Sequence, residues 1–154
     1  MNIIEGGLDD PRVVALLAEH IEAARAHTSC DSAHVLDVGQ LKSSDIRFWT
    51  AWEGDQVVGT GALKRLDAFH GEIKSMHTHR SHRRKGVAAT ILNHILAAGK
   101  QMGLTRISLE TGSWPYFDAA RELYKQHGFE ECPPFGAYRT DPNSVFMTIT
   151  FGNR

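Results

Sequence analysis

A short basic segment with one glycine, Arg83-Arg84-Lys85-Gly86-Val87-Ala88, separates a stretch typical of a strand from a stretch typical of a helix. Before it, residues 71–78 roughly alternate polar and apolar side chains and contain no proline, which is typical of a partly buried strand. After it, apolar side chains recur at three- and four-residue spacing, which predicts an amphipathic helix from about Arg84 to Met102. A strand, a turn and a helix in this order favour an α/β fold.

The start of that predicted helix indicates an anion-binding site. The first backbone N–H groups of a helix have no partners within the helix and carry partial positive charge, so an anion is stabilised there. Gly86 would let the anion approach the backbone closely, and Arg80, Arg83, Arg84 and Lys85 would strengthen the attraction. A solvated basic helix start with a structural glycine is the alternative interpretation. The pattern therefore favours a pocket for phosphates without requiring one.

The remaining patterns predict further strands and helices along the chain. Gly54-Asp55 is a favoured hairpin turn between two stretches rich in aromatic and β-branched residues. The expected helices lie at 11–26, about 36–41, about 84–102 and about 117–126, and the expected strands lie at 47–53, 56–66, 72–78, 106–110, after 128, and at 144–151. This order predicts an α/β fold with one mixed sheet flanked by helices, in a single domain over residues 1–154.

The composition excludes several kinds of protein. The chain has 154 residues, of which 42% are apolar and 23% charged, and this suits one domain with a substantial core. The net charge of −1 gives no overall attraction to nucleic acid or to an acidic membrane. The first residues do not resemble a secretory signal, and no stretch approaches the roughly 18 apolar residues of a membrane span. We therefore expect a cytoplasmic protein that binds neither nucleic acid nor membranes.

Cysteine and histidine spacing predicts neither a disulfide nor a metal site. Cys30 and Cys132 stand far apart without a Cys-x-x-Cys pairing, so we expect free thiols. His77 and His79 would share one face of a strand with His82 nearby, but no carboxylate or thiolate ligand is adjacent. We therefore expect no metal.

Several motifs follow one another in a recognisable order. The basic turn places Arg83, Gly86 and Ala88 in the pattern Gln/Arg-x-x-Gly-x-Gly/Ala. The accompanying stretches are Gly71-Glu72-Ile73-Lys74-Ser75-Met76, Ile107-Ser108-Leu109-Glu110, Ala120-Arg121-Glu122-Leu123-Tyr124 and Gly128-Phe129. Together they cover roughly residues 50–150 and resemble the GNAT superfamily of acyl-CoA-dependent N-acyltransferases. The resemblance implies a GNAT-like mixed sheet that is splayed at its centre, and an N-acetyltransferase that uses acetyl-CoA.

The resemblance also implies where acetyl-CoA binds. The strand end at Met76, His77 and Thr78 would contact pantetheine, and the N–H of Met76 or His77 would polarise the thioester oxygen. The pyrophosphate would rest on the turn formed by Arg83, Arg84, Lys85, Gly86, Val87, Ala88 and Ala89. Phe117 departs from the family pattern, because many relatives have an asparagine there that contacts pantetheine. An aromatic ring at this position would instead contribute to packing.

Three residues are candidates for catalysis. Acyl transfer to an amine requires a base for the amine proton and an acid for the departing thiolate. Glu72 is the first candidate for the base, and Glu110 on the neighbouring strand is its rival or an anchor for the acceptor. An exposed carboxylate paired with a basic residue is the alternative interpretation of Glu72. Tyr124 occupies the position of the general acid in many relatives, and its alternative role is packing in the core.

The acceptor side is the least determined by the sequence. In this fold acceptor contacts tend to come from the early helices and a late loop, which points to His34, Tyr138, Arg139 and Asn143. These residues suit a primary amine of a small molecule or peptide, with a carboxylate bound by Arg139. A non-catalytic acyl-CoA sensor and a polyanion or RNA module at Arg80–Lys85 remain as alternatives. The resemblance also makes a homodimer possible, because family members often dimerise, although no residue specifies the interface.

Overall fold

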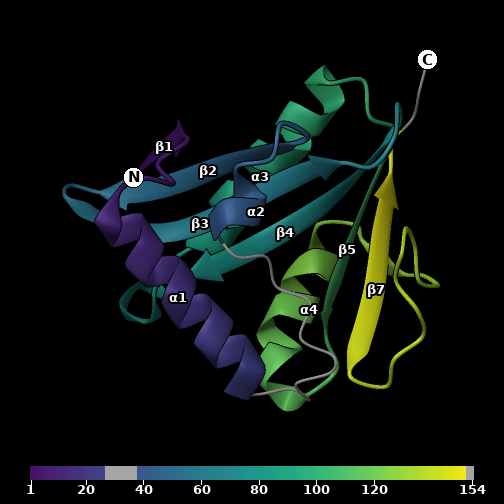
Figure 1. Ribbon diagram of the computed structural model, residues 1–154. Helices are drawn as coiled ribbons and strands as arrows, with labels where there is room; N and C mark the ends of the chain where they lie inside the picture. The colour runs from purple at the N-terminus through teal and green to yellow at the C-terminus, as the bar shows by residue number, and fades with distance from the viewer. Residues whose placement is uncertain (27–37, 152–154) are drawn as a thin grey trace.

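The computed structural model describes residues 1–26 and 38–151 (Figure 1). Its strands are β1 (Asn2–Glu5), β2 (Ile46–Glu53), β3 (Gln56–Arg65), β4 (His70–Thr78), β5 (Arg106–Gly112), β6 (Glu130–Glu131) and β7 (Ser144–Thr150). Its α-helices are α1 (Pro11–Ala26), α2 (Val38–Leu41), α3 (Val87–Gln101) and α4 (Asp118–Gln126). Two short 3-10 helices, η2 (Arg80–His82) and η3 (Pro115–Phe117), precede α3 and α4. The predicted α/β class is confirmed.

The strands form one mixed sheet in the order β1-β2-β3-β4-β5-β7-β6. Every neighbouring pair is antiparallel except β4 and β5, which run parallel because α3 crosses between them. The hairpin predicted across Gly54-Asp55 joins β2 to β3, and Gly54 adopts the positive φ of 57° that this tight turn requires.

Helices cover both faces of the sheet, and each face has its own apolar cluster. In Figure 1, α1 and α2 lie in front of the sheet and α3 lies behind it. The front cluster joins Leu17 of α1 and Leu41 of α2 to Phe48 of β2. The rear cluster is larger and joins α3 and α4 to the sheet through buried residues such as Ile91 and Tyr124. The central strands are thus packed between two layers of helices.

The sheet opens at its centre. β4 and β5 pair only from His70 opposite Arg106 to Ile73 opposite Leu109, although both strands continue beyond those residues. β5 stays paired with β7 as far as Gly112, so it follows β7 and leaves β4. Figure 1 shows the two strands diverging downward, with α4 between them in this view. The centrally splayed sheet implied by the resemblance is therefore confirmed.

An irregularity in β4 lies beside this opening. Between Thr60 and Ala62 of β3 the register with β4 shifts, and Ser75 has a φ of 55°, which is uncommon for a residue other than glycine. The Thr60 hydroxyl donates to the Ser75 carbonyl at 2.8 Å and holds it in place. The bulge adds one residue to β4 just before Met76. The side chains at the end of the strand therefore alternate between the two faces of the sheet in the opposite order from a regular strand.

The sequence-based element boundaries agree with the structure to within a few residues at most positions. β1 was not expected, and α3 begins at Val87 instead of about residue 84. The later start has a local cause, because Arg84 and Gly86 have φ values of 64° and 83° and cannot continue a right-handed helix. None of the helices within residues 1–26 and 38–151 is long and apolar enough to cross a membrane.

Candidate active site

A cleft of about 560 Å³ lies where β4 and β5 diverge. Its walls come from β4, β5, η2, the start of α3, η3, α4 and the loop before β7, with His20 contributed by α1. The predicted site residues that line it are Glu72, Met76, His77, Thr78, Arg83, Arg84, Gly86, Val87, Ala88, Ala89, Glu110, Tyr124, Tyr138 and Asn143. Lys85 and Arg139 do not line it, and His34 lies outside the described residues.

The basic turn lies at one end of the cleft. Arg84 and Gly86 have positive φ values, so the backbone curls before α3 begins at Val87. A Cβ built on Gly86 would meet no atom within 4 Å, so the space above this glycine is open. Within the described residues, no carboxylate pairs with Arg83, Arg84 or Lys85. Uncompensated cations beside a helix N-terminus favour an anion at this end.

The opening between the strands exposes backbone groups along the cleft. Beyond Ile73, the edge of β4 that faces β5 has no strand partner, and Met76, His77 and Thr78 of this edge line the cleft. Backbone N–H and C=O groups are obligatory hydrogen-bonding groups. The edge is therefore suited to binding an extended molecule with amide and carbonyl groups.

Glu72 lies on β4 and belongs to a buried polar trio with Lys74 and Tyr138. Lys74 Nζ donates to Glu72 Oε2 at 2.8 Å and to Tyr138 Oη at 3.0 Å, and Tyr138 Oη donates to the same Glu72 Oε2 at 2.6 Å. The side chains of Lys74 and Glu72 are only 9% and 5% exposed. Glu72 is thus paired with a basic residue, as its alternative interpretation expected, but the pair is buried in the cleft wall.

The second carboxylate oxygen of Glu72 is in a different situation. No hydrogen bond within the described part of the chain reaches Oε1, because both bonds to this carboxylate converge on Oε2. In that same part, the one buried side-chain nitrogen or oxygen without a hydrogen-bond partner is Nε2 of His77. Oε1 of Glu72 has no partner among the described residues and is not one of these buried atoms, so it is accessible, and Glu72 lines the cleft.

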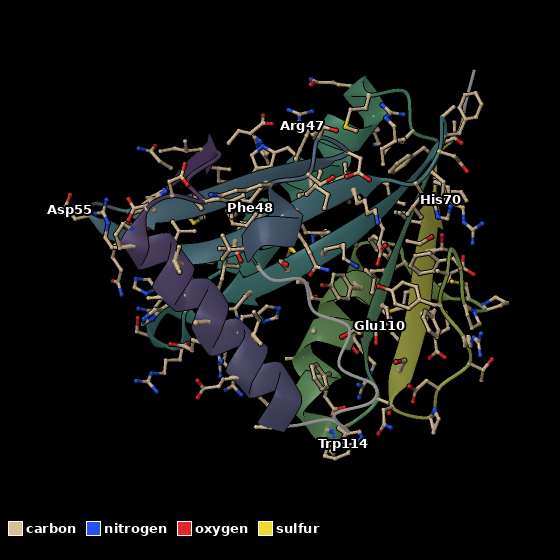
Figure 2. The ribbon with its side chains drawn as sticks, in the orientation of Figure 1. Arg47, Phe48, Asp55, His70, Glu110 and Trp114 are labelled. Atoms are coloured by element: carbon tan, nitrogen blue, oxygen red, sulfur yellow. The ribbon has the colours of Figure 1, made fainter. Side chains whose placement is uncertain are left out.

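Glu110 lies on the neighbouring strand β5, beyond the last residue pair that joins β5 to β4. Ser144 Oγ of β7 donates to its Oε2 at 2.7 Å. In Figure 2, Glu110 lies along the diverging part of β5, whereas His70 lies at the end where β4 and β5 meet. The structure thus brings both predicted carboxylates to one cleft.

Tyr124 lies on α4, with its ring packed edge-on against Phe129 at 5.6 Å between ring centroids. Burial raises the pKa of its phenol above the ordinary value, so the hydroxyl keeps its proton at neutral pH. No hydrogen bond among the described residues uses this hydroxyl. It is not one of the buried polar atoms without a partner, so it is accessible, and Tyr124 lines the cleft. Tyr124 combines a ring in the core with a protonated hydroxyl at the site.

His77 projects from β4 toward α1, where its ring lies 4.7 Å from that of His20. Burial, together with the smaller effect of the nearby charge of Arg83, lowers the pKa of His77 to about 4. Burial likewise lowers the pKa of His20 to about 3. His77 Nε2 lies 3.5 Å from a carboxylate oxygen of Glu19. Both imidazoles are neutral at pH 7, so this wall of the cleft adds no positive charge.

Phe117 forms part of the cleft wall by packing on Gly112. A Cβ built on Gly112 would lie 2.1 Å from the Phe117 ring, so only glycine fits beneath it. Arg121 donates to the Gly112 carbonyl and to Asp118, which fixes the end of β5 against α4. Phe117 therefore contributes an aromatic ring to the cleft wall, at the position where the family pattern has the side-chain amide of an asparagine.

Two basic residues of the cleft, Lys74 and His20, were given no role in the sequence analysis. Lys74 could have been found, because it lies two positions after Glu72 and would share its face of a strand. His20 could not, because nothing in the pattern of α1 distinguishes it from an ordinary helix histidine. No cluster of three or more potential metal ligands occurs in the described ranges 1–26 and 38–151.

Comparison with known proteins agrees with this geometry. The sequence model of the acetyltransferase (GNAT) family matches residues 14–129. The uncharacterized N-acetyltransferase YsnE of Bacillus subtilis is 49% identical over 148 residues, covering 96% of this chain and 98% of its own. The uncharacterized N-acetyltransferase YedL of Escherichia coli is 47% identical over 143 residues, covering 93% and 90%.

A solved structure extends the comparison to the fold. An acyl-CoA N-acyltransferase structure from Klebsiella pneumoniae superposes with a TM-score of 0.78 at 24% identity, covering 98% of this chain and 97% of its own. The chain therefore belongs to the acetyltransferase (GNAT) family. Within it, the protein is an acetyl-CoA-dependent N-acetyltransferase, as the resemblance implied.

Proposed function

We propose that the protein transfers the acetyl group of acetyl-CoA directly to a primary amine of a small molecule or peptide, with both substrates bound at once. The observation that carries this proposal is the single cleft that joins a basic turn, an open strand edge, two carboxylates and a protonated phenol. Acyl transfer needs these groups together, because proximity and fixed dipoles supply much of the rate enhancement.

The turn before α3 would bind the pyrophosphate of the co-substrate. Backbone N–H groups at the start of α3 would donate to phosphate oxygens, and Arg83 and Arg84 would contribute charge. The unpaired edge of β4 would hold the pantetheine arm. Its N–H groups at Met76 or His77 would then lie beside the thioester carbonyl, where fixed donors stabilise developing negative charge.

Glu72 and Glu110 are the candidates for removing the amine proton. Oε1 of Glu72 is accessible and Glu72 lines the cleft, so Glu72 can accept a proton directly or through one water molecule. As the nitrogen–carbon bond forms, the carbon–sulfur bond breaks and the sulfur needs a proton. Tyr124 is suited to supply it, because burial keeps the phenol protonated, its hydroxyl is accessible, and Tyr124 lines the cleft.

Calorimetric titration with acetyl-CoA, CoA and 3′-dephospho-CoA, followed by an assay of thiol release with a panel of amines, tests this function. We expect acetyl-CoA to bind, and thiol release to require both acetyl-CoA and an amine. Binding without thiol release for any amine would favour a non-catalytic acyl-CoA sensor. Failure to bind acetyl-CoA at millimolar concentration, with binding of other polyanions instead, would contradict the proposal.

A further inference from the structure

We propose that the acceptor is a small zwitterion of the amino-acid class, with its ammonium group at Glu72 Oε1 and its carboxylate bound by the ammonium group of Lys74. This inference rests on the function proposed above and narrows its acceptor. It is carried by the buried Lys74–Glu72 pair in the cleft wall and by the groups that this pair leaves available.

Burying the Lys74–Glu72 pair carries a cost in free energy. Removing two charges from water carries a penalty that their attraction only partly offsets, so buried ion pairs are weak sources of stability. Lys74 and Glu72 are both nearly inaccessible apart from the side that lines the cleft. A desolvated cation and anion held side by side are complementary to a ligand that carries both charges in the opposite order.

The hydrogen bonds within the trio leave one group of each sign for a ligand. An ammonium group has three N–H donors, and Lys74 uses two of them on Glu72 Oε2 and Tyr138 Oη. Glu72 accepts both of its bonds at Oε2, so Oε1 is available to an ammonium group. The third donor of Lys74 is correspondingly available to a carboxylate.

The charges elsewhere in the cleft favour the same ligand. A plain ammonium ion would be placed beside Lys74, where the two positive charges repel each other, and a plain carboxylate would be placed beside Glu72 and Glu110. His20 and His77 are neutral at pH 7, and Arg83 and Arg84 lie at the far end, on the basic turn. Among the described side chains that line the cleft, Lys74 is therefore the cation that lies away from the basic turn. Arg139, the carboxylate ligand expected from the sequence, does not line it.

Matched sets of acceptors test this inference. Each set consists of an L-amino acid, its carboxamide and its decarboxylated amine, for example phenylalanine, phenylalaninamide and 2-phenylethylamine, with leucine and lysine as further sets. We expect kcat/KM for at least one acid to exceed that of its amide and its amine by about tenfold or more, the scale of one charge-assisted hydrogen bond. Because the amide has the more readily deprotonated amine, a preference for the acid cannot come from amine basicity.

Variants of Lys74 test whether this side chain causes the preference for the acid over its amide. Lys74→Met should bring the acid-to-amide ratio of kcat/KM close to one, whereas Lys74→Arg should keep part of it. Lys125→Met is the matched control, because Lys125 is exposed on α4 and does not line the cleft. A general loss of activity would lower kcat/KM equally for the acid and for the amide. A merely structural role of Lys74 would therefore leave the acid-to-amide ratio unchanged.

A binding measurement covers the case in which Lys74→Met does not fold. The double variant Glu72→Gln/Lys74→Met leaves no uncompensated buried charge, and we expect it to bind CoA normally while losing detectable binding of the amino acid to the CoA complex. Retention of the acid-to-amide ratio in Lys74→Met, or equal use of acids, amides and amines by the wild type, would overturn the inference. So would acetyl-CoA binding without acetylation of any amino acid. Absence of acetyl-CoA binding would instead refute the proposed function itself.

Discussion

The hydroxyl of Tyr138 donates a 2.6 Å hydrogen bond to Glu72, a residue 66 positions earlier in the chain. This bond ties the loop before β7 to the central strand β4. Phe135 and Phe146 pack against the Tyr138 ring, with centroids at 5.2 Å and 5.4 Å, and hold the phenol in place. The orientation of Glu72 therefore depends on a residue from a loop far away in the sequence.

Replacing Tyr138 by phenylalanine tests this dependence. The ring and its aromatic packing would remain, whereas Glu72 Oε2 and Lys74 Nζ would each lose a partner. Loss of a hydrogen bond to a buried charged group costs about 1.5–3 kcal/mol. We expect urea denaturation to show a free energy of unfolding lower by about that amount. A change below about 0.5 kcal/mol would mean that water replaces the phenol.

Tyr124→Phe should separate catalysis from packing. The ring contact with Phe129 is unaffected, so stability and acetyl-CoA affinity should stay close to those of the wild type. Turnover should fall by about 10- to 1000-fold, the scale of a lost general acid. Single-turnover kinetics together with calorimetry make the comparison. Wild-type turnover in this variant would assign Tyr124 to the core alone.

Gly86→Trp should abolish acetyl-CoA binding, and the chain offers a matched control for it. Gly86 and Gly103 both have a φ of 83° with no atom within 4 Å of a built Cβ, but Gly103 does not line the cleft. Tryptophan at either position meets the same backbone strain, on the order of 1 kcal/mol or more. Calorimetry should show lost binding for Gly86→Trp and normal binding for Gly103→Trp. Equal affinities would move the phosphate site elsewhere.

The two buried histidines predict loss of stability in mild acid. His77 has a pKa of about 4 in the folded protein and about 6.5 when unfolded, so below pH 6.5 the unfolded state binds more protons. The stability that His77 contributes is complete above pH 6.5 and is lost as the pH falls toward 4. Between pH 7 and pH 5 this amounts to about 2 kcal/mol. His77→Gln should flatten the pH dependence of the unfolding free energy by that amount, and an unchanged slope would contradict the assignment.

The sequence predicted the elements whose signals are local. Gly54-Asp55 specified its hairpin, and Arg83 and Gly86 specified the turn before α3, because glycine conformations and helix starts depend on neighbouring residues. β1 was missed because it is an edge strand whose residues are mostly exposed, so it shows no buried alternation.

The candidate site was predicted as a set of residues but not as a set of contacts. Glu72 and Tyr138 were each singled out, yet their hydrogen bond joins segments that only the complete fold brings together. Lys74 was given no role in the site, because a lysine on a strand is ordinarily a solvated charge. Arg139 was expected on a late loop at the cleft, but which residues of a loop line a cleft depends on the complete fold and not on local patterns.

Four residue pairs join β4 to β5, and all of them lie at the end where the two strands have not yet diverged. At this end a Cβ built on Gly71 would lie 2.7 Å from Leu104 Cδ1. Because Gly71 belongs to these pairs and directly precedes Glu72, we expect a side chain at position 71 to shift β4 against β5 and so to change the spacing between Glu72 and Glu110. We therefore expect the width of the active-site cleft to depend on a residue that takes no part in its chemistry.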